Sequence, residues 1–123
     1  MNVNCPCCSS LPFESCCEPF IKGESPPETP EQLMRSRYTA YATGAIDYLI
    51  STTHPKTRNR FSRRDIENWS RSNRWIKLEV LNAHGDEVEF KAYYMEGLSP
   101  IQVHHEHSKF RREDGKWYYL DHV

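Results

Sequence analysis

Five cysteines lie within the first seventeen residues of this 123-residue chain, and no cysteine follows them. A segment of about twenty residues is too short to fold around a core of its own. A divalent cation bound by several thiolates would order such a segment, because the free energy of metal binding becomes free energy of folding. The cysteine cluster therefore predicts a small metal-bound unit at the amino end, followed by one compact domain.

The spacing of the cysteines favours a structural zinc ion. Zinc in such sites is held by four cysteine or histidine side chains in a tetrahedron, and eight residues separate two cysteine pairs here. The predicted ligands are Cys5, Cys7, Cys16 and Cys17. Cys8 is a fifth thiol that could replace Cys7, and Lys22 could balance the charge of four thiolates. A redox-active thiol cluster and a copper or cadmium thiolate cluster are the alternatives.

After a proline-rich connector, the sequence predicts three helices. Thr29 can cap the first helix, and Gly44 can end it. A second, short helix covers residues 46–53 and stops before Pro55, because the residue preceding a proline avoids the helical conformation. The third helix begins at Ser62, whose hydroxyl suits a helix start.

The second half of the chain alternates apolar and polar residues with the period of two that is typical of strands. Turn residues such as Asp114-Gly115 separate the alternating runs and predict hairpins. The predicted strands cover residues 76–81, 88–94, 101–113 and 116–121. The fold class is therefore α+β, with helices packed on a curved antiparallel sheet. Such a cone has an open mouth, where a pocket can form.

Several polar and aromatic side chains are candidates for that pocket. They are Arg37, Tyr38, Tyr41, His54, His105, Glu106 and Tyr119. His54 could lie at the mouth of the cone, although a lone histidine is more often structural, and His105 is placed on the inward face together with Val103, where a histidine hydrogen-bonded under the helices is favoured over a general base. Neighbours on a strand point to opposite faces, so His105 and Glu106 are not expected to form a catalytic dyad. No motif for a catalytic residue or an organic cofactor is recognised, and the interior suits a small apolar ligand.

The charge distribution suggests what the surface can bind. Eight basic residues and two acidic ones lie between positions 56 and 77, although the net charge of the chain is −1. This segment predicts either an anionic partner such as RNA or an acidic protein, or a solvated helix surface. No run approaches the roughly 20 apolar residues of a membrane span, and Met1–Cys5 lacks the features of a secretory signal. We therefore expect a cytoplasmic protein with reduced thiols.

Several short motifs resemble those of a known family. Cys5-Pro6-Cys7, Leu11-Pro12-Phe13 and Cys16-Cys17 are similar to the SEC-C zinc motif, and the run from Leu33 to Tyr41 adds to the likeness. Together with His105–Phe110 and Asp114–Tyr119, they make the chain similar to the YchJ-like bacterial family over nearly its whole length. The main domain of that family resembles nuclear transport factor 2 (NTF2).

The resemblance implies a SEC-C-like zinc motif over residues 1–23, with the four ligands given above, and an NTF2-like domain over residues 28–123. Family members usually carry glycine at the positions of Cys8 and Ser10. The resemblance also suggests an accessory protein whose zinc motif and segment 56–77 contact a ribosome, RNA or an export-related protein. Alternatively, the cone is a small-molecule binding site or an isomerase-like or dehydratase-like active site, a prediction that depends on whether its interior is hollow.

Overall fold

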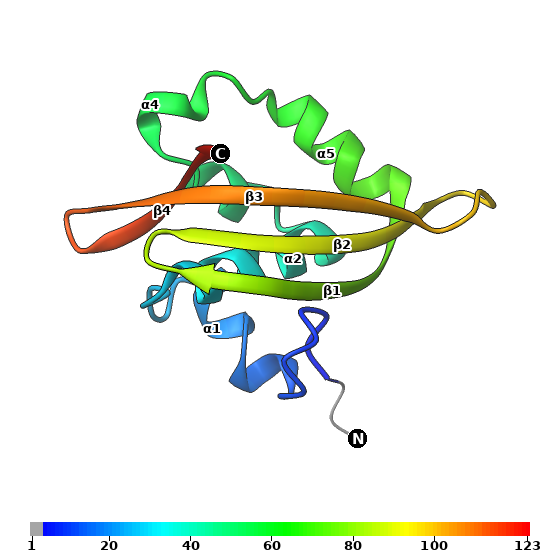
Figure 1. Cartoon of the computed structure of the whole chain (residues 1–123), viewed down its shortest axis with the longest axis horizontal. Coiled ribbons are helices and arrows are strands. Elements are labelled where there is room, and N and C mark those ends of the chain that lie inside the picture. The colour runs from blue at the N-terminus through cyan, green and yellow to red at the C-terminus, as the bar shows by residue number, and fades with distance from the viewer. Residues whose placement is uncertain (1–3) are drawn as a thin grey trace.

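The structure is a computed structural model that describes residues 4–123. In this part of the chain the helices come first and the four strands follow them. Met1–Val3, the start of the predicted segment 1–23, lie outside the described residues. The helical elements are η1 (Phe13–Ser15), α1 (Glu18–Ile21), α2 (Pro30–Thr43), α3 (Ile46–Ser51), α4 (Pro55–Arg58) and α5 (Arg63–Ser72). The strands are β1 (Asn73–His84), β2 (Glu87–Glu96), β3 (Gln102–Glu113) and β4 (Lys116–His122). Figure 1 shows their arrangement.

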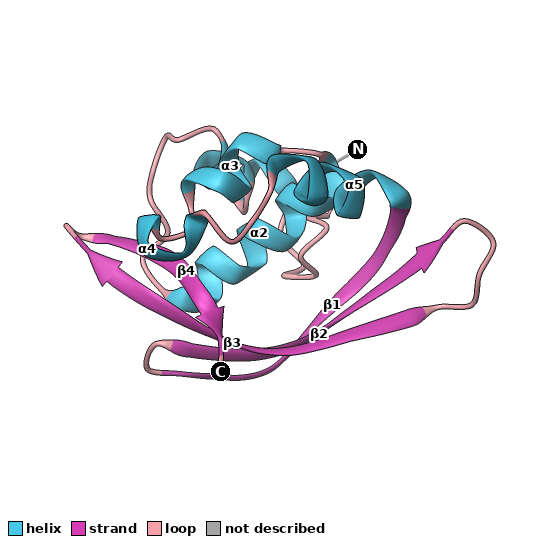
Figure 2. Ribbon diagram, turned by 90° about the horizontal axis from the view of Figure 1, so that it is seen from above, coloured by secondary structure: helices cyan, strands magenta, loops and turns pink. Residues whose placement is uncertain are grey.

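The four strands form one antiparallel meander in the order β1-β2-β3-β4. The sheet curves around the helices, and in Figure 2 all the labelled helices lie on its concave side. The predicted α+β cone is therefore confirmed. One predicted strand face is wrong at Ile76, which is 40% exposed although Leu78 and Val80 face the interior. A register shift between Trp75 and Lys77 turns Ile76 outward and Trp75 inward.

Local capping explains where α2 begins and ends. The Thr29 hydroxyl accepts a hydrogen bond from the Gln32 amide, and the Gln32 side chain accepts one from the Glu28 amide. Gly44 closes the helix in the left-handed conformation with φ of 81°. Between these caps, Leu33, Met34 and Tyr38 are buried, so α2 supplies the centre of the core.

The cysteine segment packs against the cone. We call residues 4–23 the knuckle; it lies along the outer edge of β1 in Figure 1. Cys5, Cys7 and Cys17 are buried in the same hydrophobic cluster as Tyr38 of α2 and Phe110 of β3. The knuckle and the cone therefore share one core.

Among residues 4–123, no helix combines the length and the apolar character that a bilayer crossing requires.

Candidate metal centre and cavity

Four cysteine sulfur atoms converge in the knuckle. The Sγ atoms of the predicted ligands Cys5, Cys7, Cys16 and Cys17 all lie within 4.8 Å of one another. Cys16 Sγ is 3.6 Å from Cys7 Sγ and 3.8 Å from Cys17 Sγ. A zinc ion with four sulfur ligands at about 2.3 Å requires sulfur atoms about 3.8 Å apart. This cysteine cluster therefore has the donor set and the spacing to hold one metal ion.

The acid–base chemistry of the cysteine cluster also suits a cation. Hydrogen bonds from Cys17 and Cys5 lower the pKa of Cys7 far below its ordinary value. Burial raises the pKa of Cys16 to about 11, and the hydrogen bonding with Cys5 raises that of Cys17. One thiolate is thus stabilised by its neighbours, while further ionisation is opposed. A bound divalent ion would remove this opposition by taking the place of the protons.

Residues from α2 and the knuckle surround the sulfur atoms. Thr39 Oγ1 lies 3.5 Å from Cys5 Sγ and 3.4 Å from Cys17 Sγ, and Ser9 Oγ lies 3.1 Å from Cys16 Sγ. These hydroxyls can orient the ligands, as groups around metal ligands commonly do.

Two predictions about charge and the fifth thiol can be checked against these contacts. Lys22 does not balance the cysteine cluster, because it is largely exposed and pairs with Glu18. Instead, Arg35 donates to the Cys7 carbonyl oxygen over 2.7 Å. Cys8 is exposed and lies outside the cluster, with its sulfur 3.4 Å from the Leu78 amide nitrogen, so it does not take the place of Cys7.

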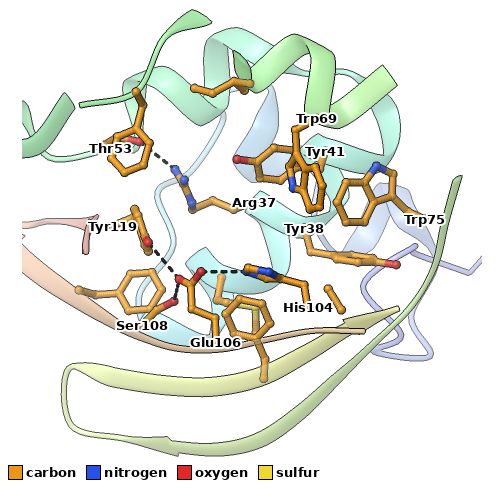
Figure 3. A pocket seen from close by; sticks show the side chains of 16 residues that line it. Arg37, Tyr38, Tyr41, Thr53, Trp69, Trp75, His104, Glu106, Ser108 and Tyr119 are labelled. Atoms are coloured by element: carbon orange, nitrogen blue, oxygen red, sulfur yellow. Dashed lines mark hydrogen bonds and ion pairs between the residues drawn. The ribbon is translucent and has the colours of Figure 1, made fainter. Parts of the chain in front are cut away.

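The interior of the cone is hollow. A cavity of about 240 Å³ is lined by side chains of the helices α2 and α5 and of the strands of the sheet. Its aromatic wall includes Trp69 and Trp75, whose ring centroids are 5.6 Å apart. Tyr38 and Tyr41 of α2 also contact Trp75, at 5.9 Å and 5.6 Å. Figure 3 shows these rings on one side of the cavity and polar side chains on the other.

The polar side is organised around Glu106. Its carboxylate accepts hydrogen bonds from His104 Nε2 over 3.0 Å, from Tyr119 Oη over 3.0 Å and from Ser108 Oγ. We call these four residues the polar cluster; the dashed lines in Figure 3 mark their contacts. Burial alone would raise the pKa of Glu106, but the three hydrogen bonds outweigh it and lower the pKa to about 2. Glu106 is therefore ionised at neutral pH and too weakly basic to accept a proton readily.

Arg37 reaches into the cavity from α2. Its Nη1 donates to Leu49 O over 2.9 Å and to Thr52 Oγ1 over 2.7 Å, and it also approaches Thr53 Oγ1. The guanidinium carbon lies 4.6 Å from the centroid of the Tyr119 ring, a cation–π contact. Burial lowers the pKa of Arg37, but arginine starts so high that the side chain remains charged at neutral pH.

Comparison with known proteins identifies the family. The family described as YchJ, middle NTF2-like domain matches residues 29–122. A UPF0225 protein of Geobacter sulfurreducens is 40% identical over 95% of this chain and 76% of its own length. The chain belongs to the YchJ-like family. A UPF0225 protein of Serratia proteamaculans is also 40% identical, over 95% of this chain and 80% of its own length.

Two solved structures resemble nearly the full length of this family member. The solution structure of a SEC-C motif containing protein from Rhodopseudomonas palustris has a TM-score of 0.89 and 37% identity, and covers 98% of both chains. The crystal structure of a SEC-C motif containing protein from Psychrobacter arcticus has a TM-score of 0.81 and 31% identity, covering 95% of this chain and 80% of that one. The NTF2-like cone and the preceding cysteine motif are thus those of the YchJ-like family.

The structure brings together most of the pocket candidates. Those that line the cavity are Arg37, Tyr38, Tyr41, Glu106 and Tyr119. The candidate His54 does not line the cavity and has the structural role that was the alternative for it: it is buried, and its Nδ1 accepts a hydrogen bond from the Lys56 amide at the start of α4. Its Nε2 is 2.7 Å from Glu113 Oε2, which fixes the ring away from the cavity mouth.

His105 is misplaced by the sequence analysis. It lies on the outer face of β3, 51% exposed, with Nε2 2.7 Å from Glu89 Oε2. The inward residues of β3 are instead His104, Glu106 and Ser108, and Val103 is 49% exposed. Apolar Val103 does not mark the buried face, because it points out while the polar residues point in. His104 and Ser108 are therefore cavity residues that were not predicted, although they share the face of the predicted Glu106 through the strand period of two.

Three of the eight basic residues in segment 56–77 form ion pairs with other residues of the described chain. Arg60 pairs with Asp121 over 2.6 Å, and Arg63 pairs with Asp47 over 2.6 Å. Arg71 lies 3.7 Å from Glu67. Contact with a ribosome, RNA or an export-related protein stays a prediction.

Proposed function

We propose that this YchJ-like chain is a small-molecule binding protein whose knuckle holds a structural zinc ion. The observation that carries the proposal is the cavity of about 240 Å³, with aromatic walls on one side and Arg37 and the polar cluster on the other. Pockets that bind small molecules combine a mainly apolar lining with a few fixed polar groups. The cone has this composition, and Arg37 and Glu106 can orient a ligand within it.

Zinc is the metal that best fits the cysteine cluster. Four thiolates complete a tetrahedron and leave no position for water or substrate, which is the arrangement of a structural site. The metal would link the turn that carries Cys5 and Cys7 to the junction of η1 and α1, where Cys16 and Cys17 lie, and three of the four cysteines are buried against the cone. When bound, it supplies a crosslink. The residues around it orient the thiolates, through Thr39 and Ser9, and exclude water from them.

The polar cluster supports binding more strongly than acid–base catalysis. Glu106 has three donors and a pKa of about 2, so it is a fixed acceptor and not a proton acceptor near neutral pH. Tyr119 donates to Glu106, and burial raises its pKa well above the ordinary value, so it stays protonated. These two groups therefore hold the wall of the cavity in one arrangement.

A thermal-shift and fluorescence screen of small metabolites against the zinc-loaded chain tests the proposal. Because Trp69 and Trp75 line the cavity, a ligand should change the tryptophan emission as well as raise the unfolding temperature. At one hundred times its dissociation constant a ligand adds about 2.7 kcal/mol to the free energy of unfolding. A broad library that produces neither signal would contradict the proposal.

A further inference from the structure

Two nitrogen atoms of the Arg37 guanidinium, Nε and Nη2, are not used in hydrogen bonds to the described residues. All its hydrogen bonds to residues 4–123 come from Nη1, and their acceptors are neutral: one carbonyl and two hydroxyl oxygens. Among residues 4–123, Asn73 Oδ1 is the side-chain polar atom that is both fully buried and without a hydrogen-bond partner. Because Nε and Nη2 of Arg37 also lack a partner but do not share that burial, they are reached by solvent. Since Arg37 lines the cavity, its unused donors adjoin the cavity space.

The positive charge of Arg37 is also without a direct counter-ion. Within residues 4–123, no carboxylate oxygen lies at ion-pair distance from its guanidinium, although ion pairs of the other cavity and surface groups are plentiful. Glu106 is the acidic group of the cavity lining, and its carboxylate is directed to His104, Ser108 and Tyr119. A partly buried cation without an anionic partner is costly in free energy. The arrangement is that of a site which receives its anion from outside.

We infer that the cavity binds a small carboxylic acid with a single aromatic ring, its carboxylate on Nε and Nη2 of Arg37. This inference rests on the proposed function and adds the class of ligand. The Nε and Nη2 edge of a guanidinium presents two parallel N–H donors, which match the two oxygens of a carboxylate. The rings of Trp69 and Trp75 lie on the opposite side of the cavity, where an aromatic ring would stack edge-on or offset.

The volume of the cavity and the charges of its lining narrow the class of ligand further. A cavity of roughly 150 Å³ in another protein holds benzene, so about 240 Å³ accommodates one ring and a carboxylate but not a fused polycyclic acid. Arg37 supplies one positive charge, and Glu106 is a nearby negative charge. Because these two charges oppose each other, a dianion such as a phosphate monoester gains little further attraction and costs more to desolvate, so a monoanion is favoured.

Calorimetric titration of the zinc-loaded full chain with matched probes tests the inference. Benzoate, benzamide and phenyl phosphate share a ring and differ in charge. We expect benzoate to bind about tenfold or more tightly than benzamide, because its hydrogen bonds to Arg37 are charge-assisted. Phenyl phosphate should bind more weakly than benzoate. The Arg37 Nε–H signal in a nitrogen-15 spectrum should shift with benzoate more than with benzamide, and this measurement needs no variant.

Substitution adds a second test. In Arg37→Gln, the preference for benzoate over benzamide should fall to about one, whereas Arg64→Gln, an exposed change of equal charge, should keep it. If Arg37→Gln does not fold, the nitrogen-15 comparison on the unaltered chain decides. Benzamide that equals benzoate, or phenyl phosphate that exceeds it, would overturn the inference and leave the proposed function standing. No binding by any of the three probes at millimolar concentration would also overturn the inference, whereas the proposed function is overturned only by a broad library that gives no signal.

Discussion

Glu106 shows how a single polar residue can be kept inside an aromatic cavity. Its side chain is 19% exposed, and a carboxylate in that position would be unfavourable without donors. His104 and Ser108 lie two residues away on either side along β3, so both face the same way as Glu106. Tyr119 reaches it from β4 over 3.0 Å. The residue is therefore stabilised in its charged form by its own strand and the adjacent one.

The lowered pKa of Glu106 predicts a pH dependence of stability. A carboxyl group whose pKa is about 2 in the folded chain and 4.5 in the unfolded one stabilises the fold above about pH 4.5. That contribution is lost as the pH falls toward 2. We expect the gap in unfolding free energy between the unaltered chain and Glu106→Gln to shrink by about 2 kcal/mol from pH 5 to pH 3. Urea unfolding of the two proteins at each pH measures this gap. Zinc release in acid affects both proteins alike and therefore does not change it. A constant gap would contradict the prediction.

The backbone conformation of Ser10 indicates that a glycine at this position would stabilise the knuckle. Its φ is 72°, a left-handed conformation that costs a non-glycine residue roughly 1 kcal/mol or more, and its side chain makes no hydrogen bond to residues 4–123. Ser10→Gly should therefore raise the unfolding free energy of the zinc-loaded chain by about 1 kcal/mol. Ser15→Gly, at an exposed position without positive φ, is the matched control and should lower it. Equal effects of the two changes in urea unfolding would argue against a conformational cause.

At the scale of the element, α2 serves both the metal centre and the cavity. Arg35 and Thr39 face the knuckle, where they contact Cys7 O and the sulfur atoms of Cys5 and Cys17. Arg37 and Tyr41 line the cavity. Because both sets are attached to one capped helix, a displacement of α2 at the knuckle would also move the cavity wall.

The contacts of Thr39 predict that α2 contributes to the metal affinity of the cysteine cluster. Thr39→Val keeps the shape of the side chain but removes the hydroxyl beside Cys5 and Cys17. Loss of such a group around a metal site typically weakens metal binding about 10-fold or more. Competition with a chromophoric chelator measures the affinity. Thr43→Val is the control, since the Thr43 hydroxyl bonds to the Thr39 carbonyl and not to sulfur; an equal loss there would mean that the Thr39 hydroxyl has no special role.

Local elements were predictable from sequence, and pairings between distant residues were not. The limits of α2 follow from Thr29 and Gly44, whose effects extend over a single turn. The four-residue helix α4 was missed, because its cap His54 gains its position from Glu113, 59 residues away. Likewise, the face of Ile76 depends on a register shift against β2 that alternation alone does not contain.

In the candidate site, too, local features could be predicted from the sequence and features that depend on distant residues could not. The four metal ligands could be predicted because their spacing is short and their residue type is rare. The inward face of β3 could not be predicted by hydrophobicity, since Val103 is exposed while the polar side chains of His104 and Glu106 point into the cavity. A cavity lined by polar side chains inverts the usual pattern of burial, so hydrophobicity alone does not predict which residues line it.

For the molecule as a whole, the shared core means that knuckle and cone should unfold together. Buried cysteines of the knuckle and Phe110 of β3 belong to one hydrophobic cluster, and Trp75 packs against it. A metal that binds only the folded chain stabilises every part that unfolds with its site. We therefore expect zinc removal by a strong chelator to lower the stability of the cone as well as that of the knuckle.

Urea unfolding with and without chelator, followed by tryptophan fluorescence and far-ultraviolet circular dichroism, measures this coupling. The two signals should coincide in one transition, and chelation should lower the unfolding free energy by at least about 2 kcal/mol. Cys8→Ser should keep this response because Cys8 lies outside the cysteine cluster, whereas Cys17→Ser should abolish it by removing a buried ligand. An unchanged tryptophan transition after chelation would mean that the metal orders the knuckle alone and that the common core does not transmit its stabilisation.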